Sequence, residues 1–290
     1  MTNISASQVK ELREKTGLGL MDCKKALEEA NGDLDLAVEE LRKTSGLKAS
    51  KKSSRSAADG LIGIKSLEGK SFMVEINCET DFVARDDSFN SFTQEVLEIV
   101  SSNRDKSLEE LLEEGIEEKR EKLVQKLGEN IVVRRITASE DSADSSGVYL
   151  HSNNKIGTII SLKGGTEEVA KDIAMHAAAT DPIAISPSEI SQDVIAKERE
   201  IYKAQSEDSG KPADIVEKMV EGKIGKFLSE VSLTEQDFVK DPSIKIKDLL
   251  KNSNASIIGF RRFEVGEGIE VENVTFLKQM KVYICVKMLK

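Results

Sequence analysis

The fold is decided by residues 60–78, whose sequence is GLIGIKSLEGKSFMVEINC. Apolar residues lead into a turn at residues 67–70, and beyond the turn every second residue from Phe72 to Cys78 is apolar. Alternation with a period of two is typical of β-strands, and a short polar turn joins two of them into a hairpin. This stretch therefore predicts a β-hairpin with one buried face.

The same order of elements recurs later in the chain. After the first hairpin come a predicted helix, a charged helical stretch that ends at Leu127, and a strand at residues 131–136. The second copy has a hairpin at residues 147–162, a helix at residues 166–176 and a strand at residues 257–263. Both closing strands carry a pair of adjacent arginines. The sequence therefore predicts a duplicated α+β unit.

The second copy contains an insertion, which we predict to be an antiparallel helical hairpin at residues 186–229. Ser186 and Glu189 have the spacing of a capping box, and Pro187 stands at the first helical position. The predicted helix runs to about Asp208 and a second helix returns to the core. Because the two helices have mainly each other to pack against, this hairpin is the place where a homodimer, if the chain forms one, is expected to be held together.

The N-terminal residues predict a bundle of three short helices. Ser5 and Gln8 have the spacing of a capping box, and Gly32 suits the left-handed end of the second helix. The residues that follow are rich in Ser, Ala and Lys, which is typical of a linker. The predicted fold class is thus α+β, and its parts are the helical bundle at 1–46, the linker at 47–59, the first core unit at 60–140, the second core unit at 141–265 and a C-terminal module at 266–290.

The composition limits the classes of function. Hydrophobic residues make up 39% and charged residues 32%, which allows a packed core. The net charge of −10 argues against a protein that grips phosphate backbones, so no direct nucleic-acid partner is expected. The sequence shows no secretory signal pattern and no apolar run near the roughly 18 residues of a membrane span. Its three cysteines are widely spaced and match neither a disulfide framework nor a metal site. We expect a cytoplasmic protein that does not enter membranes.

No chemistry of its own is predicted for this chain. The two histidines, His151 and His176, have no visible third partner for a nucleophilic triad, and the glycine that a phosphate-binding loop requires is missing. A thiol enzyme that uses Cys78 stays open as a weak alternative. We therefore predict no catalytic residue, no metal and no cofactor.

One unusual stretch is residues 77–84, NCETDFVA, which leaves a predicted strand and enters a predicted helix. Loops at such places carry function on a rigid scaffold. From the residues alone, the favoured interpretation is that Phe82 fills the core and Asp81 caps the helix. A binding role is the alternative.

Three motifs resemble those of the elongation factor Ts family. The first is VKELREKTG at residues 9–17 with MDCKKAL at residues 21–27, the second is EINCETDFVA at residues 75–84, and the third is RFEVGEG at residues 262–268. They are long, in order and correctly separated, and the resemblance extends over about residues 1–270. Beyond it the tail at residues 271–290 departs from the alanine-rich helix that is usual in the family.

The resemblance implies a nucleotide exchange factor that binds elongation factor Tu, in its GDP-bound and nucleotide-free forms, and promotes GDP release during translation elongation. It implies that the N-terminal bundle is similar to a ubiquitin-associated domain and docks on the nucleotide domain of the partner. The family's contacts beside the partner's magnesium site correspond here to Thr80, Asp81, Phe82 and Val83. Further contacts near the nucleotide correspond to Leu127, Gly128 and His151. A helical adaptor that binds another partner, independently of GDP and magnesium, is the alternative from a different class.

Overall fold

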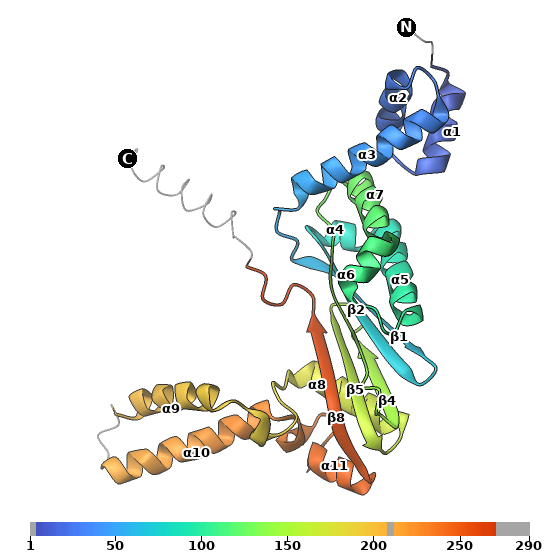
Figure 1. The fold of residues 1–290 in the computed structure, drawn as a ribbon. Helices are drawn as coiled ribbons and strands as arrows, with labels where there is room; N and C mark the ends of the chain where they lie inside the picture. The colour runs from blue at the N-terminus through green and yellow to red at the C-terminus, as the bar shows by residue number, and fades with distance from the viewer. Residues whose placement is uncertain (1–3, 208–211, 271–290) are drawn as a thin grey trace, which may run out of the picture.

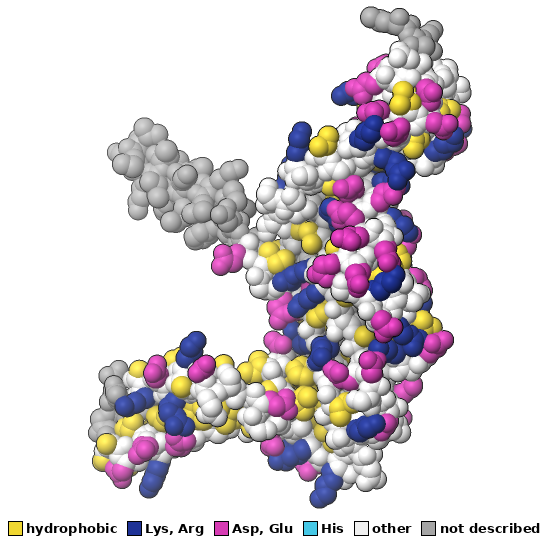
Figure 2. Space-filling model, viewed as in Figure 1, with side chains coloured by type: hydrophobic (Ala, Val, Ile, Leu, Met, Phe, Trp, Pro, Cys, Tyr) yellow, Lys and Arg dark blue, Asp and Glu magenta, His cyan; other side chains and the backbone are white. Residues whose placement is uncertain are grey.

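The computed structural model describes residues 4–207 and 212–270, which form an elongated molecule of mixed helices and strands (Figure 1). The predicted α+β class is confirmed. A helical bundle lies at one end, two three-stranded antiparallel sheets follow along the long axis, and a pair of helices projects sideways at the far end. On the face drawn in Figure 2, basic and acidic side chains are interspersed. Most of the predicted C-terminal module, from residue 271 onward, falls outside the described residues.

The N-terminal bundle consists of α1 (Ala6–Thr16), α2 (Leu20–Glu29) and α3 (Leu34–Lys52). The capping box of α1 is formed, because Ser5 Oγ accepts from the Gln8 N–H at 3.3 Å and Gln8 Oε1 accepts from the Ser5 N–H at 3.0 Å. Asp33 caps α3 through its Oδ1 atom. The three helices enclose a small apolar core that includes Leu12, Cys23 and Leu27.

The linker predicted at residues 47–59 is wrong in its first part, because helix α3 continues to Lys52. Its second half packs on α7 (Glu117–Leu127), where the buried Ser45 hydroxyl donates to Gln125 Oε1. Ala49 is also buried, within the core under the first sheet. Packing of this kind stabilises a helix well beyond its intrinsic propensity. The segment without regular structure therefore begins only at Ser53.

The first sheet has the strand order β1-β2-β3. Its strands are β1 (Asp59–Leu67), β2 (Lys70–Cys78) and β3 (Val132–Ala138). The helices between β2 and β3 are α4 (Asp81–Ala84), α5 (Asp87–Ser102), α6 (Leu108–Leu111), a π-helical segment (Leu112–Ile116) and α7. Phe72, Val74 and Ile76 of β2 face these helices and share a core with Phe89 of α5.

The second sheet has the order β4-β5-β8, so that here too the third strand pairs with the second strand of a hairpin. Its strands are β4 (Ser145–Leu150), β5 (Ile156–Gly164) and β8 (Ala255–Glu264). The helices α8 (Glu167–Thr180) and α11 (Ile246–Asn252) pack on one face of it, and β6 (Asp237–Phe238) and β7 (Asp241–Lys245) form a small ribbon. Its core includes Ile160, Leu162 and Ile173.

The two sheets pack on each other through the faces that their helices leave open. Ile62 and Met73 of the first sheet meet Ile159 and Phe263 of the second in one buried cluster. Strand β2 is consequently buried on both faces from Ser71 to Cys78, and the prediction of a hairpin with one buried face is wrong. The second sheet covers the face that the alternation pattern assigned to solvent.

A buried charge lies at the same junction. Glu75 of β2 has no exposed surface, and its carboxylate accepts from Arg134 Nη1 at 3.0 Å, from Arg135 Nε and from the Gly266 N–H at 2.9 Å. The Arg135 guanidinium lies 4.1 Å from the centre of the Phe263 ring. An ionised carboxylate tolerates burial only when it is fully paired, and the partners of Glu75 come from β3 and from the segment after β8.

The inserted hairpin is present but begins later than predicted. The residues of the proposed capping box form only a single 3₁₀ turn, Pro187–Glu189, in which the Glu189 carboxylate accepts from the Ser186 hydroxyl at 3.0 Å and from the Ile185 N–H at 3.2 Å. The first long helix is α9 (Gln192–Glu207), with the Ser191 hydroxyl accepting at its start, and α10 (Ala213–Val231) returns. Within residues 4–207 and 212–270, no helix is both long and apolar enough to cross a bilayer.

Close packing of the sheets gives a stability prediction for Gly157→Ala. The added methyl group would lie 2.7 Å from Ile62 Cγ2 and 2.8 Å from Met73 Sδ, so these side chains of the facing sheet must shift. We expect a loss of about 1–3 kcal/mol in the free energy of unfolding, measured by urea denaturation. The control is Gly225→Ala in α10, where nothing lies within 4 Å, and a gain of up to about 1 kcal/mol is expected there. Equal stabilities for the two variants would contradict this account of the junction.

A second prediction concerns the base of the hairpin. Backbone bonds close it, from the Ile183 N–H to Val231 O at 3.0 Å and from the Leu233 N–H to Ala184 O at 3.0 Å. Replacing residues 187–228 by a short Gly/Ser linker keeps these bonds and the core cluster beyond them, so we expect cooperative thermal unfolding to persist. A gradual, non-cooperative melting curve for the shortened protein would show that the core needs the hairpin.

Candidate functional site

The turn after β2 presents an aromatic side chain to solvent. Thr80 caps the single-turn helix α4, with its Oγ1 atom accepting from the Val83 N–H at 3.4 Å. Val83 and Ala84 are buried and anchor the turn, whereas Phe82 is 80% exposed. The interpretation of Phe82 as a core residue is therefore wrong. The described part of the chain exposes no other large hydrophobic side chain to this degree.

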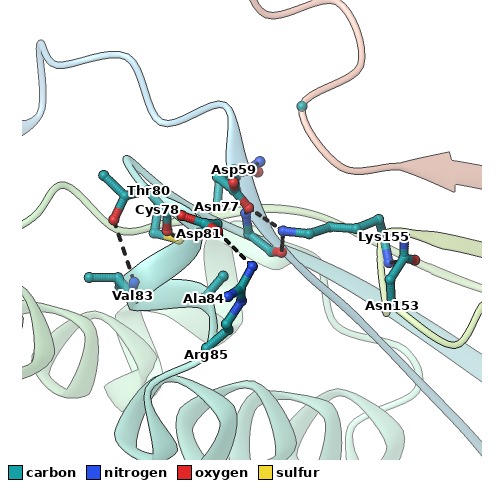
Figure 3. Close-up of polar contacts among 12 residues, drawn as sticks. Asp59, Asn77, Cys78, Thr80, Asp81, Val83, Ala84, Arg85, Asn153 and Lys155 are labelled. Carbon is teal, nitrogen blue, oxygen red and sulfur yellow. Dashed lines mark hydrogen bonds and ion pairs between the residues drawn. The ribbon is translucent and has the colours of Figure 1, made fainter.

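Asp81 has a different place from the predicted one. It is the first residue of α4 and not its cap, a role that Thr80 takes. Its carboxylate accepts from Arg85 Nη2 at 2.7 Å, one helical turn later (Figure 3). The side chain of Arg85 is 77% exposed, and an ion pair so open to water contributes only about 0–1 kcal/mol. A partner could therefore separate the two side chains at little cost.

The backbone of the turn is held by a residue that the sequence did not suggest. Glu129 lies in the loop between α7 and β3, and its Oε2 atom accepts from the N–H groups of Glu79 and Thr80 at 3.0 Å each. Its Oε1 atom accepts from the Thr80 hydroxyl at 2.6 Å. In return, Glu79 Oε1 accepts from the Asn130 N–H at 2.7 Å. Glu129 was one carboxylate among many in a charged region, and only its partners single it out.

Leu127 and Gly128 end α7 immediately before this loop. Gly128 adopts φ 81°, a left-handed conformation suited to glycine, and its N–H closes the helix on Val124 O at 2.9 Å. The Gly128 carbonyl accepts from the Lys52 ammonium at the end of α3. Leu127 is half-buried against the core. The structure thus brings these two predicted residues to the loop that supports the Phe82 turn.

His151 lies on the loop between β4 and β5, in the second sheet. It is exposed, and its Nδ1 atom lies 3.2 Å from the Tyr149 hydroxyl. Together with Met175 and Val239 it lines a cavity of about 500 Å³. This loop is bound to β1 through Lys155, whose ammonium donates to Asp59 Oδ1 and to Gly60 O (Figure 3).

Asp59 connects the two halves of the site. Besides holding Lys155, it accepts from Asn77 Nδ2 at its carbonyl oxygen, at 3.1 Å, beside the start of the Phe82 turn. The Ile62 N–H also donates to Asn154 O, at 2.8 Å, and fixes the His151 loop on β1. The turn and the loop are therefore mounted on one strand, although they belong to different sheets.

Cys78 is not a nucleophile in this environment. Its side chain is fully buried, and its Sγ donates to Thr80 O at 3.2 Å. Burial, with the negative charges of Asp59 and Glu129, raises the pKa of the thiol to about 12. Because the thiolate is the reactive form, this environment argues against a thiol enzyme that uses Cys78.

His176 is a core residue, as predicted, and has no surface exposed to water. Burial lowers the pKa of its imidazole. Its Nδ1 atom accepts from the Val239 N–H at 3.2 Å, and Nε2 lies 2.9 Å from Gln236 Oε1, which identifies the neutral form protonated at Nε2. Among the described residues, no three His, Cys, Asp or Glu side chains are grouped so that they could hold a metal ion. What this region offers is a surface with one projecting aromatic ring.

Comparison with known proteins gives one consistent family. The family model for elongation factor Ts matches residues 79–267, more than half of the chain. An elongation factor Ts of Hahella chejuensis is 54% identical over 282 residues, covering 97% of this chain and 98% of that protein. The factors of Marinobacter nauticus and Francisella tularensis subsp. novicida are 51% and 49% identical, each covering 97% of this chain and, in turn, 97% and 98% of their own lengths.

The pKa of Cys78 predicts its reactivity. With a pKa of about 12, about one thiol in ten thousand is ionised at pH 8, so we expect no labelling by a thiol reagent in the folded protein and complete labelling in urea. Peptide mass spectrometry locates the label. Because the folded pKa lies above its usual value of 9.0, the associated stability is present below pH 9.0 and is lost as the pH rises toward about 12. Rapid labelling of native Cys78 at pH 8 would contradict this environment.

Proposed function

Because this chain belongs to the elongation factor Ts family, we propose that it is a nucleotide exchange factor, which binds the GTPase elongation factor Tu in the cytoplasm and promotes GDP release during translation elongation. In this proposal the chain makes and breaks no covalent bond. It binds the GDP-bound and the nucleotide-free GTPase, and it binds the nucleotide-free state more tightly. Only such a difference in affinity can shift the equilibrium toward release.

The observation that carries the proposal is the exposure of Phe82 on a preformed turn. The ring is 80% exposed, while the next two residues, Val83 and Ala84, are buried and the Thr80 cap is in place. Burying a phenylalanine side chain contributes about 1.5–3 kcal/mol, and here that contribution is available only when a partner covers the ring. A rigid turn also loses little conformational entropy when it binds.

We propose that Phe82 inserts into an apolar slot beside the magnesium site of the GTPase. Asp81, whose ion pair with Arg85 is weak, is released to disturb the water and carboxylate shell of the metal. Thr80 and Val83 hold the two residues in place. Magnesium supplies much of the charge that retains nucleotide phosphates, so a displaced metal loosens GDP.

Insertion of the Phe82 side chain alone is not enough to release the nucleotide. Reversing a two-state population takes about 5.5 kcal/mol of differential affinity, more than a single aromatic contact provides. The remaining contacts in the proposal are Leu127 and Gly128 at the end of α7, His151 in the second sheet, and the N-terminal bundle. That bundle exposes Met21 by 73% and Leu20 by 54%, an apolar surface suited to docking on the nucleotide domain.

The test is release of fluorescent GDP from elongation factor Tu. We expect Phe82→Ala to leave the free energy of unfolding within about 0.5 kcal/mol, because the ring is exposed, and to slow stimulated release at least about tenfold. Ile201→Ala is the control, since Ile201 is 47% exposed on α9, far from the turn, and its loss should affect neither quantity. A normal rate of stimulated GDP release with stably folded Phe82→Ala would contradict the proposed insertion of Phe82.

Asp81→Ala tests the second half of the proposal. It should also slow release, with a stronger dependence on magnesium concentration than Phe82→Ala, because its proposed target is the surroundings of the metal. The two residues address one site, so the double variant should lose less than the sum of the two single effects. Retention of the GTPase that is independent of GDP and magnesium would instead favour a helical adaptor.

A further inference from the structure

We propose that Glu129 is a positioning residue: its carboxylate keeps the Phe82 turn in its binding conformation, so that exchange depends on a side chain that does not itself enter the partner. The inference rests on the proposed function for its effect on GDP release. Its effect on the turn is independent of that function and can be measured separately.

Glu129 replaces a missing strand neighbour. The pairing of β2 with β3 ends at Asn77 and Val132, so the N–H groups of Glu79 and Thr80 lie beyond the sheet. Both donate to Glu129 Oε2 at 3.0 Å. Backbone donors in a half-buried turn need partners, and hydrogen bonds to a carboxylate are stronger than those to a neutral acceptor.

The same carboxylate controls the cap of α4. The Thr80 hydroxyl donates to Glu129 Oε1 at 2.6 Å, and this bond orients its lone pairs toward the Val83 N–H, 3.4 Å away. A helix of a single turn is not stable by its own hydrogen bonds. The orientation of α4, and with it the direction of the Phe82 ring, therefore depends on the contact between Thr80 and Glu129.

The support reaches back to the N-terminal bundle. The side-chain amide of Asn130, next to Glu129, donates through Nδ2 to Arg55 O at 2.8 Å. Lys52 at the end of α3 donates to the Gly128 carbonyl. The loop at residues 128–130 is thus fixed on one side by the segment after α3 and on the other by the Phe82 turn. The geometry couples the two surfaces that are proposed to touch the GTPase.

Glu129→Gln is the direct test. The amide keeps the size of the side chain and one acceptor oxygen, but its NH₂ group is unable to accept, so at least one arm of the contact is lost. If the turn is then correctly formed in about a tenth of the molecules, the apparent second-order rate constant of stimulated GDP release should fall about tenfold. Glu113→Gln, on an exposed residue before α7, is the matched control and should leave the rate unchanged.

A double-variant cycle separates positioning from a general loss of structure. If Glu129 acts through the turn, adding Glu129→Gln to the double variant Asp81→Ala, Phe82→Ala should change the release rate by less than about twofold. A further tenfold loss in that background would overturn the inference. So would a normal rate for Glu129→Gln while Phe82→Ala is impaired. Thr80→Val, which removes the hydroxyl that bonds Glu129 and caps α4, should act in the same direction if Glu129→Gln folds poorly.

Hydrogen exchange decides the matter without the partner. In Glu129→Gln we expect the amides of residues 79–83 to exchange at least about tenfold faster, with exchange in α8 unchanged. Unchanged exchange at these amides would overturn the inference by itself. If the unmodified protein fails to stimulate GDP release, the proposed function is wrong, and this measurement still establishes whether Glu129 holds the turn.

Discussion

The arrangement of this molecule depends on one buried carboxylate. Glu75 lies between the two sheets, without exposed surface, and is bound by Arg134, Arg135 and the Gly266 N–H. Burying a single charge without partners would cost several kcal/mol. A shift of the sheets that separated Glu75 from these partners would therefore be strongly unfavourable. The apolar cluster beside it, with Gly157 leaving no room for a side chain, supplies the nonpolar part of the same contact.

This junction gives the candidate site its geometry. The Phe82 turn belongs to the first sheet and the His151 loop to the second, and both are mounted on β1 through Asp59 and its neighbours. Loops that must contact one partner at several points gain from a rigid support, because less freedom is lost on binding. An exchange factor in particular must convert many small contacts into one difference in affinity between nucleotide-bound and empty partner.

The continuity of α3 adds to this rigidity. A flexible tether at residues 47–59 would let the N-terminal bundle bind almost independently of the core, with a gain set only by its effective concentration. The helix instead packs on α7 as far as Lys52, through Ser45 and Ala49, and ends at the loop that supports the Phe82 turn. The irregular segment that remains is short and is itself bound by Asn130.

The sequence by itself determined the local elements: the hairpin turns, the capping box of Ser5 and Gln8, and the motifs that identify the family. Signals of this kind lie within a few residues of the structure they specify, because they satisfy neighbouring backbone groups. The tertiary structure decided that β2 is buried on both faces, that α3 continues to Lys52, and that α9 begins at Gln192. It also decided that Phe82 projects into solvent and that Glu129 holds its turn. The sequence pattern did not contain these features because burial and hydrogen-bond partners come from segments distant in the chain, and only the packed fold brings them together.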